Sequence, residues 1–205
     1  MSDKPPVAFF DFDGTLTKRD SLLPFLRFVA GTPQFFIQMI SISPVLAAYA
    51  TGILPNHVAK EKLLRHCLGG IPFQHLKKLS RNYSNTILPH ILKSEGYERF
   101  LWHKAQGHEC TLVSASLDCY LEPWAKQQGF SNCISTKLAI ENHVYTGNID
   151  GSNCYGPEKV ERIKALYPDV DRRITYAYGD SRGDREMLAL CNFGFLWEGR
   201  RFKPV

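Results

Sequence analysis

The sequence predicts an α/β fold in which a doubly wound parallel sheet carries a small helical cap inserted after the first strand. Three features of the 205-residue chain support this prediction. Short apolar runs end at a polar residue or glycine, helical patterns separate the later runs, and a block of about 70 residues after the first run shows helical patterns alone. Strands that alternate with helices form parallel sheets. Because the helical block interrupts this alternation, we interpret it as an insertion.

The predicted strands are short apolar runs of the kind that is buried on both faces of a sheet. They span residues 7–10, 111–113 and 174–178. Because the carboxyl ends of parallel strands meet at one edge of the sheet, where ligands bind, the residues that follow these runs are candidates for a functional site.

Four helical patterns complete the predicted core, at residues 95–106, 117–128, 157–166 and 182–191. Gly129 closes the second pattern and Pro168 stops the third, as is typical of helix ends. The segment 133–149 predicts a β-hairpin instead, because Thr, Val and Tyr residues flank an Asn142-His143 turn.

The block 22–92 is predicted to form several helices. Glycine and proline predict breaks at residues 31–33, Pro44, 52–55 and 69–72. We therefore expect a catalytic core of residues 1–17 and 94–205 and a helical cap of residues 18–93.

Residues 28–59 contain no Asp, Glu, Lys or Arg. Within them, the segment 35–54 is long enough to cross a bilayer as a helix. Because Pro44 and several polar residues interrupt this segment, two short helices in a hairpin are predicted instead. Two interpretations stay open: the hairpin packs inside the cap, or it exposes an apolar face, flanked by basic residues, to a membrane interface.

Composition and charge exclude several classes of protein. A hydrophobic content of 44% excludes a disordered or low-complexity chain. The net charge is +5, and residues 18–93 hold ten Lys and Arg but only two acids, Asp20 and Glu61. This excess suits an anionic substrate, an anionic membrane surface or an ordinary solvated helical face, whereas no aromatic residues interleave with it as they would in a nucleic-acid groove.

The termini and the cysteines carry further expectations. The first apolar run is too short for a signal peptide, so we expect synthesis in the cytoplasm. Six cysteines without a C-x-x-C pair predict reduced thiols rather than a zinc or redox site. The basic run 200–203 is interpreted as a solvated tail.

The strongest motif is the sequence Asp-Phe-Asp-Gly-Thr at residues 11–15, directly after the first apolar run. Asp11 and Asp13 point the same way from an extended chain, so their like charges require a cation. Mg²⁺ suits this position, because it binds carboxylate and phosphate oxygens together. A helix cap or a turn would explain one of these acids but not both.

A second motif, Gly-Asp-Ser-Arg-Gly-Asp at residues 179–184, follows the last apolar run. It predicts Asp180 as a metal ligand and Asp184 as a ligand of the metal or of its water molecules. Between the two motifs, Ser114 follows a predicted strand and Lys159 lies at the start of a predicted helix. A hydroxyl and an ammonium there suit a phosphoryl group, although Ser114 or Ser116 also suits a helix cap and Lys159 a solvated position.

These four elements, in this order, resemble the haloacid dehalogenase superfamily of phosphotransferases, whose core is Rossmann-like. The resemblance implies that Asp11 is the nucleophile that forms an aspartyl-phosphate and that Asp13 is the general acid and base. It also implies that Ser114 and Lys159 bind the phosphoryl group, and that Asp11, the Asp13 carbonyl and Asp180 hold Mg²⁺.

An acid at position 13 and an insertion after the first motif are similar to the phosphoserine phosphatase-like branch, which implies a phosphatase or a phosphomutase. Asp20 occupies the position of a substrate-binding acid in that branch, but it also suits a helix cap, and Lys62 and Arg65 are both candidates for a substrate-binding cation. The uncharged cap segment is similar to that of phosphatidylglycerophosphatase C-like members, which implies a lipid phosphate and peripheral contact with the inner membrane. A small phosphate ester, a phosphomutase substrate and a non-enzymatic binding role remain as alternatives.

Overall fold

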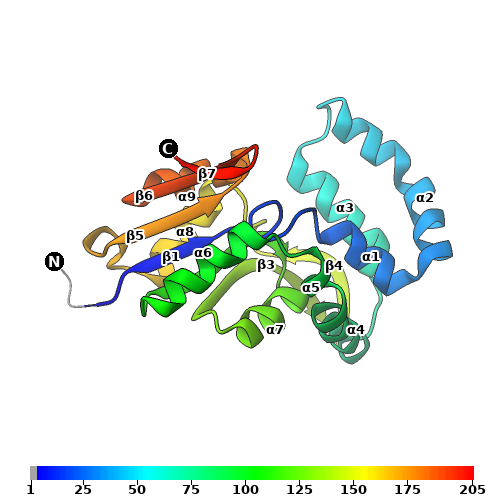
Figure 1. Ribbon diagram of the computed structural model, residues 1–205. Helices are drawn as coiled ribbons and strands as arrows, with labels where there is room; N and C mark the ends of the chain where they lie inside the picture. The colour runs from blue at the N-terminus through cyan, green and yellow to red at the C-terminus, as the bar shows by residue number, and fades with distance from the viewer. Residues whose placement is uncertain (1–3) are drawn as a thin grey trace.

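The computed structural model describes residues 4–205, and its centre is a seven-stranded sheet (Figure 1). The strand order is β4-β3-β2-β1-β5-β6-β7, with parallel pairing from β3 to β6 and antiparallel pairing at both edges. This order confirms the predicted α/β fold. The strands are β1 (Val7–Phe10), β2 (Glu109–Leu117), β3 (Asn132–Glu141), β4 (Val144–Asp150), β5 (Thr175–Gly179), β6 (Phe193–Glu198) and β7 (Arg201–Pro204).

The central strand β1 is wholly apolar because both of its faces are covered. All four of its residues are fully buried, and Phe9 lies opposite Thr111 of β2 and Ala177 of β5. The strand ends at Asp11, between the ends of β2 and β5. This is the switch point of the strand order, where open α/β sheets bind ligands.

Helices cover both faces of the sheet, as the doubly wound prediction requires. Helices α6 (Ser94–Ala105) and α7 (Asp118–Gln128) pack on the face that carries Phe10, and α8 (Pro157–Leu166) and α9 (Arg185–Leu190) pack on the face that carries Phe9. The last predicted helix begins as a 3₁₀ turn at Arg182–Asp184, and a second 3₁₀ turn spans Val170–Arg172.

The segment between β1 and α6 is helical, as predicted. Its helices are α1 (Leu22–Ala30), α2 (Thr32–Ala50), α3 (Asn56–Leu68), α4 (Phe73–Thr86) and α5 (Leu88–Ile91). Helices α1, α2 and α3 form a lobe beyond the carboxyl edge of the sheet, whereas α4 packs against α7 (Figure 1). The boundaries at residues 17/18 and 93/94 stay a prediction, and residues 1–3 of the expected core lie outside the described residues.

The predicted break at Pro44 is wrong, because α2 continues through it as one helix. Pro44 has no N–H to offer the Ile40 carbonyl, and the Ser43 hydroxyl donates to that oxygen instead, at 2.8 Å. The hairpin is formed by α2 with α3, after a turn at residues 51–55. Within residues 4–205, no single helix is long and apolar enough to cross a bilayer, and α1 with α2 meets the length and composition criteria only as a pair bent by 119°.

The predicted β-hairpin is confirmed as β3 and β4, and Asn142 and His143 form its turn with positive φ angles. Strand β4 packs closely on α3, since a Cβ on Gly147 would lie 2.3 Å from the Cα of Arg65. The interpretation of residues 200–203 as a solvated tail is right in that Arg200, Arg201 and Lys203 are exposed, but wrong in that the segment is not a free tail. Its residues largely form β7, which pairs with β6 and places Phe202 opposite Trp197.

Candidate active site

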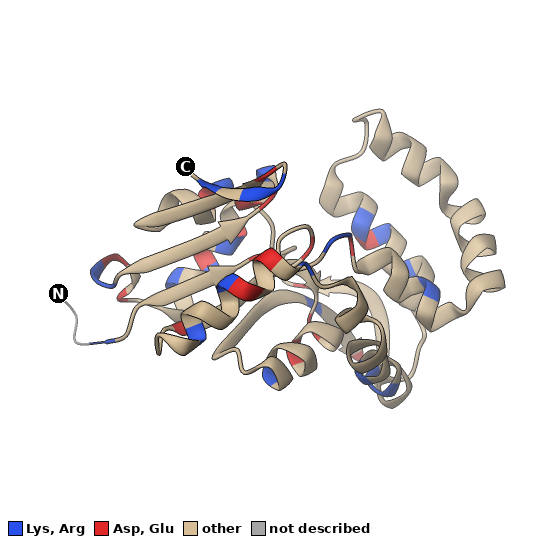
Figure 2. Cartoon of the chain, in the orientation of Figure 1, with Lys and Arg blue, Asp and Glu red and all other residues tan. Residues whose placement is uncertain are grey.

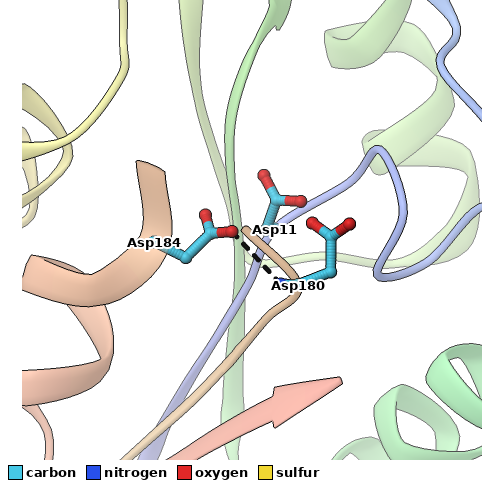
Figure 3. Close-up of side chains that lie close together, drawn as sticks. All are labelled: Asp11, Asp180 and Asp184. Carbon is cyan, nitrogen blue, oxygen red and sulfur yellow. Dashed lines mark hydrogen bonds between the residues drawn. The ribbon is translucent and has the colours of Figure 1, made fainter. Parts of the chain in front are cut away.

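Three acidic side chains gather at the carboxyl edge of the sheet (Figure 3). Asp11 follows β1, while Asp180 and Asp184 follow β5, and one carboxylate oxygen from each lies within 4.8 Å of the others. Burial and the nearby Asp184 raise the pKa of Asp11, and the same two causes raise the pKa of Asp180 to about 6. The cluster therefore requires cations to keep its acids ionised.

Lys159 supplies one cation from the first turn of α8. Its Nζ lies 2.7 Å from Asp11 Oδ1, 2.6 Å from Asp184 Oδ1 and 2.9 Å from the Val113 carbonyl oxygen. Burial opposes its charge, but the two carboxylates outweigh burial and raise the pKa of Lys159 above its usual value. The interpretation of Lys159 as a solvated residue is wrong, because the side chain is buried.

Asp184 is held through its second oxygen as well. Its Oδ2 accepts a hydrogen bond from the backbone N–H of Asp180 at 3.2 Å (Figure 3). The same oxygen accepts from the Ser181 backbone N–H and hydroxyl at 3.0 and 2.8 Å. Both oxygens of Asp184 thus have protein partners. The residue fixes the loop after β5 against Lys159.

Asp180 lies close to Gly14 and keeps one carboxylate oxygen without a partner in the described part of the chain. Asp180 Oδ1 is buried and has no hydrogen-bond partner among residues 4–205. A Cβ on Gly14 would lie 1.9 Å from Asp180 Oδ2, so only glycine, here with φ +82°, fits beside that carboxylate. A buried carboxylate oxygen without a partner, next to Asp11, fits the oxygen ligands that Mg²⁺ prefers.

Asp13 has a different environment from Asp11. One oxygen accepts a hydrogen bond of 2.8 Å from the backbone N–H of Ser21, and the other accepts one of 2.5 Å from the Ser116 hydroxyl. Burial, with a contribution from Asp20, raises the pKa of Asp13 to about 6, against the effect of these hydrogen bonds. A carboxyl group with this pKa can both donate and accept a proton near neutral pH.

Ser114 is buried where the register of β2 with β3 shifts, and its hydroxyl accepts a hydrogen bond of 3.0 Å from the Ser116 backbone N–H. Neither serine caps α7, whose N-cap is Leu117 without a side-chain hydrogen bond. The helix-cap interpretation of these two residues is therefore wrong.

Comparison with known proteins identifies the family of this chain. The model of the family described as haloacid dehalogenase-like hydrolase matches residues 8–189. The chain belongs to this family. It is 33% identical over 196 residues to protein CicA of Caulobacter vibrioides, which covers 94% of this chain and 86% of that protein. It is 27% identical over 193 residues to a probable phosphatase of Mycobacterium tuberculosis, which covers 89% of this chain and 65% of that protein.

Solved structures share the fold. A Bordetella pertussis protein of unknown function superposes with a TM-score of 0.79 at 24% identity, over 90% of this chain and 86% of that one. A substrate-bound phosphoserine phosphatase superposes with a TM-score of 0.65 at 18% identity, over 95% of this chain and 86% of that one. These similarities show that the haloacid dehalogenase-like fold extends over nearly the whole chain.

These strand-end residues open onto a cavity of about 430 Å³ that is also lined by residues of α1, α2 and α3. The predicted site residues Asp11, Asp13, Asp20, Ser114, Lys159, Asp180 and Asp184 all line it. Asp20 also accepts a hydrogen bond of 3.0 Å from the Leu23 backbone N–H, so it holds the first turn of α1. The two interpretations of Asp20 made from the sequence, a helix cap and a substrate-binding acid, are therefore compatible.

The two cap cations named from the sequence do not line this cavity, within the described part of the chain. Lys62 is exposed, and Arg65 donates instead to the Asn148 side chain at 2.8 Å. Lys60 reaches the cavity, and its Nζ lies 2.5 Å from the Ala115 carbonyl oxygen and 2.7 Å from Asn153 Oδ1. Lys60 lies three residues before the buried Leu63, so the two positions share one face of α3. This spacing is the feature of the sequence that could have indicated an inward-facing Lys60.

Proposed function

We propose that this protein is a Mg²⁺-dependent phosphatase that hydrolyses a phosphate monoester through an aspartyl-phosphate on Asp11. The observation that carries the proposal is the pair of unlike carboxylates in one cavity. Asp11 contacts the ammonium of Lys159, whereas Asp13 contacts only neutral donors and has a pKa raised to about 6. Different environments for two neighbouring carboxyl groups suit a nucleophile and an acid–base group. The similarity to a probable phosphatase supports the same activity.

In the first step, the Asp11 oxygen not bound by Lys159 attacks phosphorus, and the bond from phosphorus to the ester oxygen breaks. Asp13 gives its proton to that oxygen, and the alcohol leaves. In the second step, Asp13 takes a proton from water, whose oxygen attacks the phosphoryl group on Asp11 and releases inorganic phosphate. Lys159 and Ser114 orient the phosphoryl oxygens throughout.

Asp11, Asp180 and the backbone carbonyl of Asp13 would hold Mg²⁺. When bound there, it offsets the charge that the phosphoryl group adds to the acids. Asp184 acts through Lys159 and the loop after β5, to which its two oxygens are bound.

Phosphate release with and without Mg²⁺ tests this activity. Asp11→Asn is expected to abolish turnover, and Asp13→Asn to lower it by about 10² to 10⁴-fold. Asp171→Asn, at an exposed acid on the Val170–Arg172 turn, is the matched control and should behave as wild type. Full Mg²⁺-dependent turnover by Asp11→Asn would refute the mechanism.

For the leaving group, we infer an apolar moiety, as in a lipid phosphate such as phosphatidylglycerophosphate. The wall of the cavity opposite the acids is largely apolar and comes from the lobe of α1–α3. Its apolar residues are Leu22, Leu23, Leu46, Tyr49, Ala59 and Leu63. A wall of this kind favours an alcohol with a large apolar part over a small, wholly polar one.

We also propose that α2 lies against the cytoplasmic face of the inner membrane. Helix α2 carries no charged residue (Figure 2), and only Ile42 is buried among its 19 residues. Its outward side exposes Phe36, Ile37 and Ile40 at helical spacing, and Ile40 is 74% exposed. The helix also carries Gln and Ser, but an uncharged helix with three large apolar side chains exposed suits the interfacial layer of a membrane.

A small amino-acid ester such as phosphoserine is the second candidate. The observation that favours it is the presence of Asp20 and Lys60 on the cavity wall, since an acid and a cation match an amino and a carboxylate group. Hydrolysis of phosphatidylglycerophosphate in mixed micelles and of phosphoserine, measured side by side with Asp11→Asn as the blank, separates the two. Preference for phosphoserine would contradict the lipid proposal and leave the phosphatase mechanism intact.

A further inference from the structure

Lys93, directly before α6, is a buried lysine that lies outside the four sequence elements of the proposed active site. The residue is 8% exposed. Its ammonium donates to the Gly14 carbonyl and lies 4.1 Å from the centre of the Trp197 ring, over which it makes a cation–π contact. The side chain thus connects the loop after Asp13 with strand β6.

The backbone around Lys93 follows the same loop. The Lys93 N–H donates to the Leu16 carbonyl at 2.8 Å, and Leu92 pairs with Thr17 in an isolated β-bridge. The approach is so close that a Cβ on Gly96 would lie 2.2 Å from the Thr15 carbonyl oxygen. The loop that carries Asp13 is therefore built against residues 92–96.

Gly14 connects this contact to the proposed metal site, because its Cα faces the Asp180 carboxylate while its carbonyl accepts from Lys93. We propose that Lys93, held by Trp197, is a positioning residue that fixes the Asp13-Gly14 segment and so keeps the Mg²⁺ site open beside Asp180. This inference rests on the proposed function, because it concerns the metal site of that reaction.

Positioning and simple electrostatics predict opposite effects on Mg²⁺ affinity. Lys93 is a positive charge near Asp180, so if charge alone mattered, its removal would make Mg²⁺ bind more tightly. If Lys93 fixes the loop, its removal frees the Asp13 and Gly14 carbonyls and Mg²⁺ binds more weakly. The sign of the change therefore identifies the role.

The test is calorimetric titration of the full chain with MgCl₂ alone, without substrate. Lys93→Met, of similar length, is expected to weaken Mg²⁺ binding by about 5- to 10-fold, and Lys93→Arg, which keeps charge and donors, to restore it to within about 2-fold. Trp197→Leu is expected to weaken binding by about 3-fold through loss of the contact that holds the ammonium. Lys104→Met is the matched control, because Lys104 also lies over a ring, that of Phe100 at 5.8 Å, but its ammonium donates to the Gln128 carbonyl at 2.8 Å instead of to the loop after Asp13.

If Lys93→Met binds Mg²⁺ as tightly as the wild type or more tightly, the inference is overturned and the phosphatase proposal stands. A wild-type chain that binds no Mg²⁺ overturns the metal site and this inference together. Thermal unfolding of each variant reports folding. If Lys93→Met does not fold, Trp197→Leu decides, and wild-type affinity in that variant overturns the inference.

Discussion

Lys159 and Asp184 form a buried ion pair of 2.6 Å that joins the first turn of α8 to the loop after β5. The same ammonium contacts Asp11 at 2.7 Å, so one cation offsets two carboxylates. Because the other oxygen of Asp184 binds the backbone of residues 180 and 181, the position of that loop depends on Lys159. The pair therefore contributes to the shape of the site as well as to its charge.

Replacing Lys159 with Met leaves two buried carboxylates without their cation. We expect a loss of about 3 kcal/mol in the free energy of unfolding, as for other broken buried pairs. Added Mg²⁺ should recover part of this loss, because it binds the folded state and offsets the same carboxylates. Urea unfolding with and without Mg²⁺ measures both effects, and Lys164→Met, at an exposed lysine of α8, is the control. A loss that Mg²⁺ leaves unchanged would argue against a cation site at these acids.

Gly14→Ala tests the space beside Asp180. The new Cβ would lie 1.9 Å from the Asp180 carboxylate, and the φ of +82° strains any side chain. Gly31→Ala is a matched control, because Gly31 has a φ of +77° but nothing within 4 Å of a Cβ. Both variants should lose about 1 kcal/mol of stability from backbone strain. Only Gly14→Ala should also lose Mg²⁺ binding and at least about 100-fold in turnover, and equal behaviour of the two variants would contradict the role of Gly14.

The sequence predicts the part of the site that lies at strand ends, because those positions follow from local pattern alone. Asp11 and Asp180 follow apolar runs, and runs that form neighbouring parallel strands bring their ends together. For Lys60, the spacing from Leu63 gives the face of α3 that the residue occupies, but its approach to Ala115 depends on how the lobe of α1–α3 docks on the sheet, which that spacing does not encode. The continuity of α2 through Pro44 depends likewise on one side-chain hydrogen bond from Ser43.

Lys60 and Lys62 are two residues apart on α3 but have different surroundings. Lys60 lines the cavity, and burial lowers its pKa to about 8, whereas Lys62 is exposed. Lys60→Met should raise KM for the phosphate ester by about 10-fold through loss of a cation at the substrate cavity. Lys62→Met should leave KM unchanged. Steady-state kinetics of the two variants decide the question, and a larger effect at Lys62 would contradict the assignment of Lys60.

His103 makes stability depend on pH independently of the active site. The fully buried ring lies 2.9 Å from the Tyr178 hydroxyl and 2.8 Å from His108, and burial, with the nearby charge of His108, lowers its pKa to about 4. An unfolded histidine has a pKa near 6.5, so the unfolded chain binds the proton more tightly. The contribution of the neutral, buried His103 to the free energy of unfolding is complete above about pH 6.5 and is lost as the pH falls towards 4. We expect the wild type to lose about 2 kcal/mol over this range relative to His103→Gln in urea unfolding, and parallel curves would refute the assignment.

The exposed apolar side chains of α2 are expected to bind a membrane surface. Phe36, Ile37 and Ile40 are between 55% and 74% exposed, and a polar replacement there removes apolar area from the surface without opening a cavity in the core. The double variant Ile37→Ser with Ile40→Ser should fold with wild-type stability and turn over a short water-soluble ester normally. It should sediment with vesicles containing anionic phospholipid at least about 10-fold less than the wild type, because each buried apolar side chain contributes about 1.5 to 3 kcal/mol.

Leu166→Ser, at an exposed leucine of α8, is the control for general loss of apolar surface. Unchanged sedimentation of the double variant, or a wild-type chain that does not bind vesicles, would remove the membrane from the proposal.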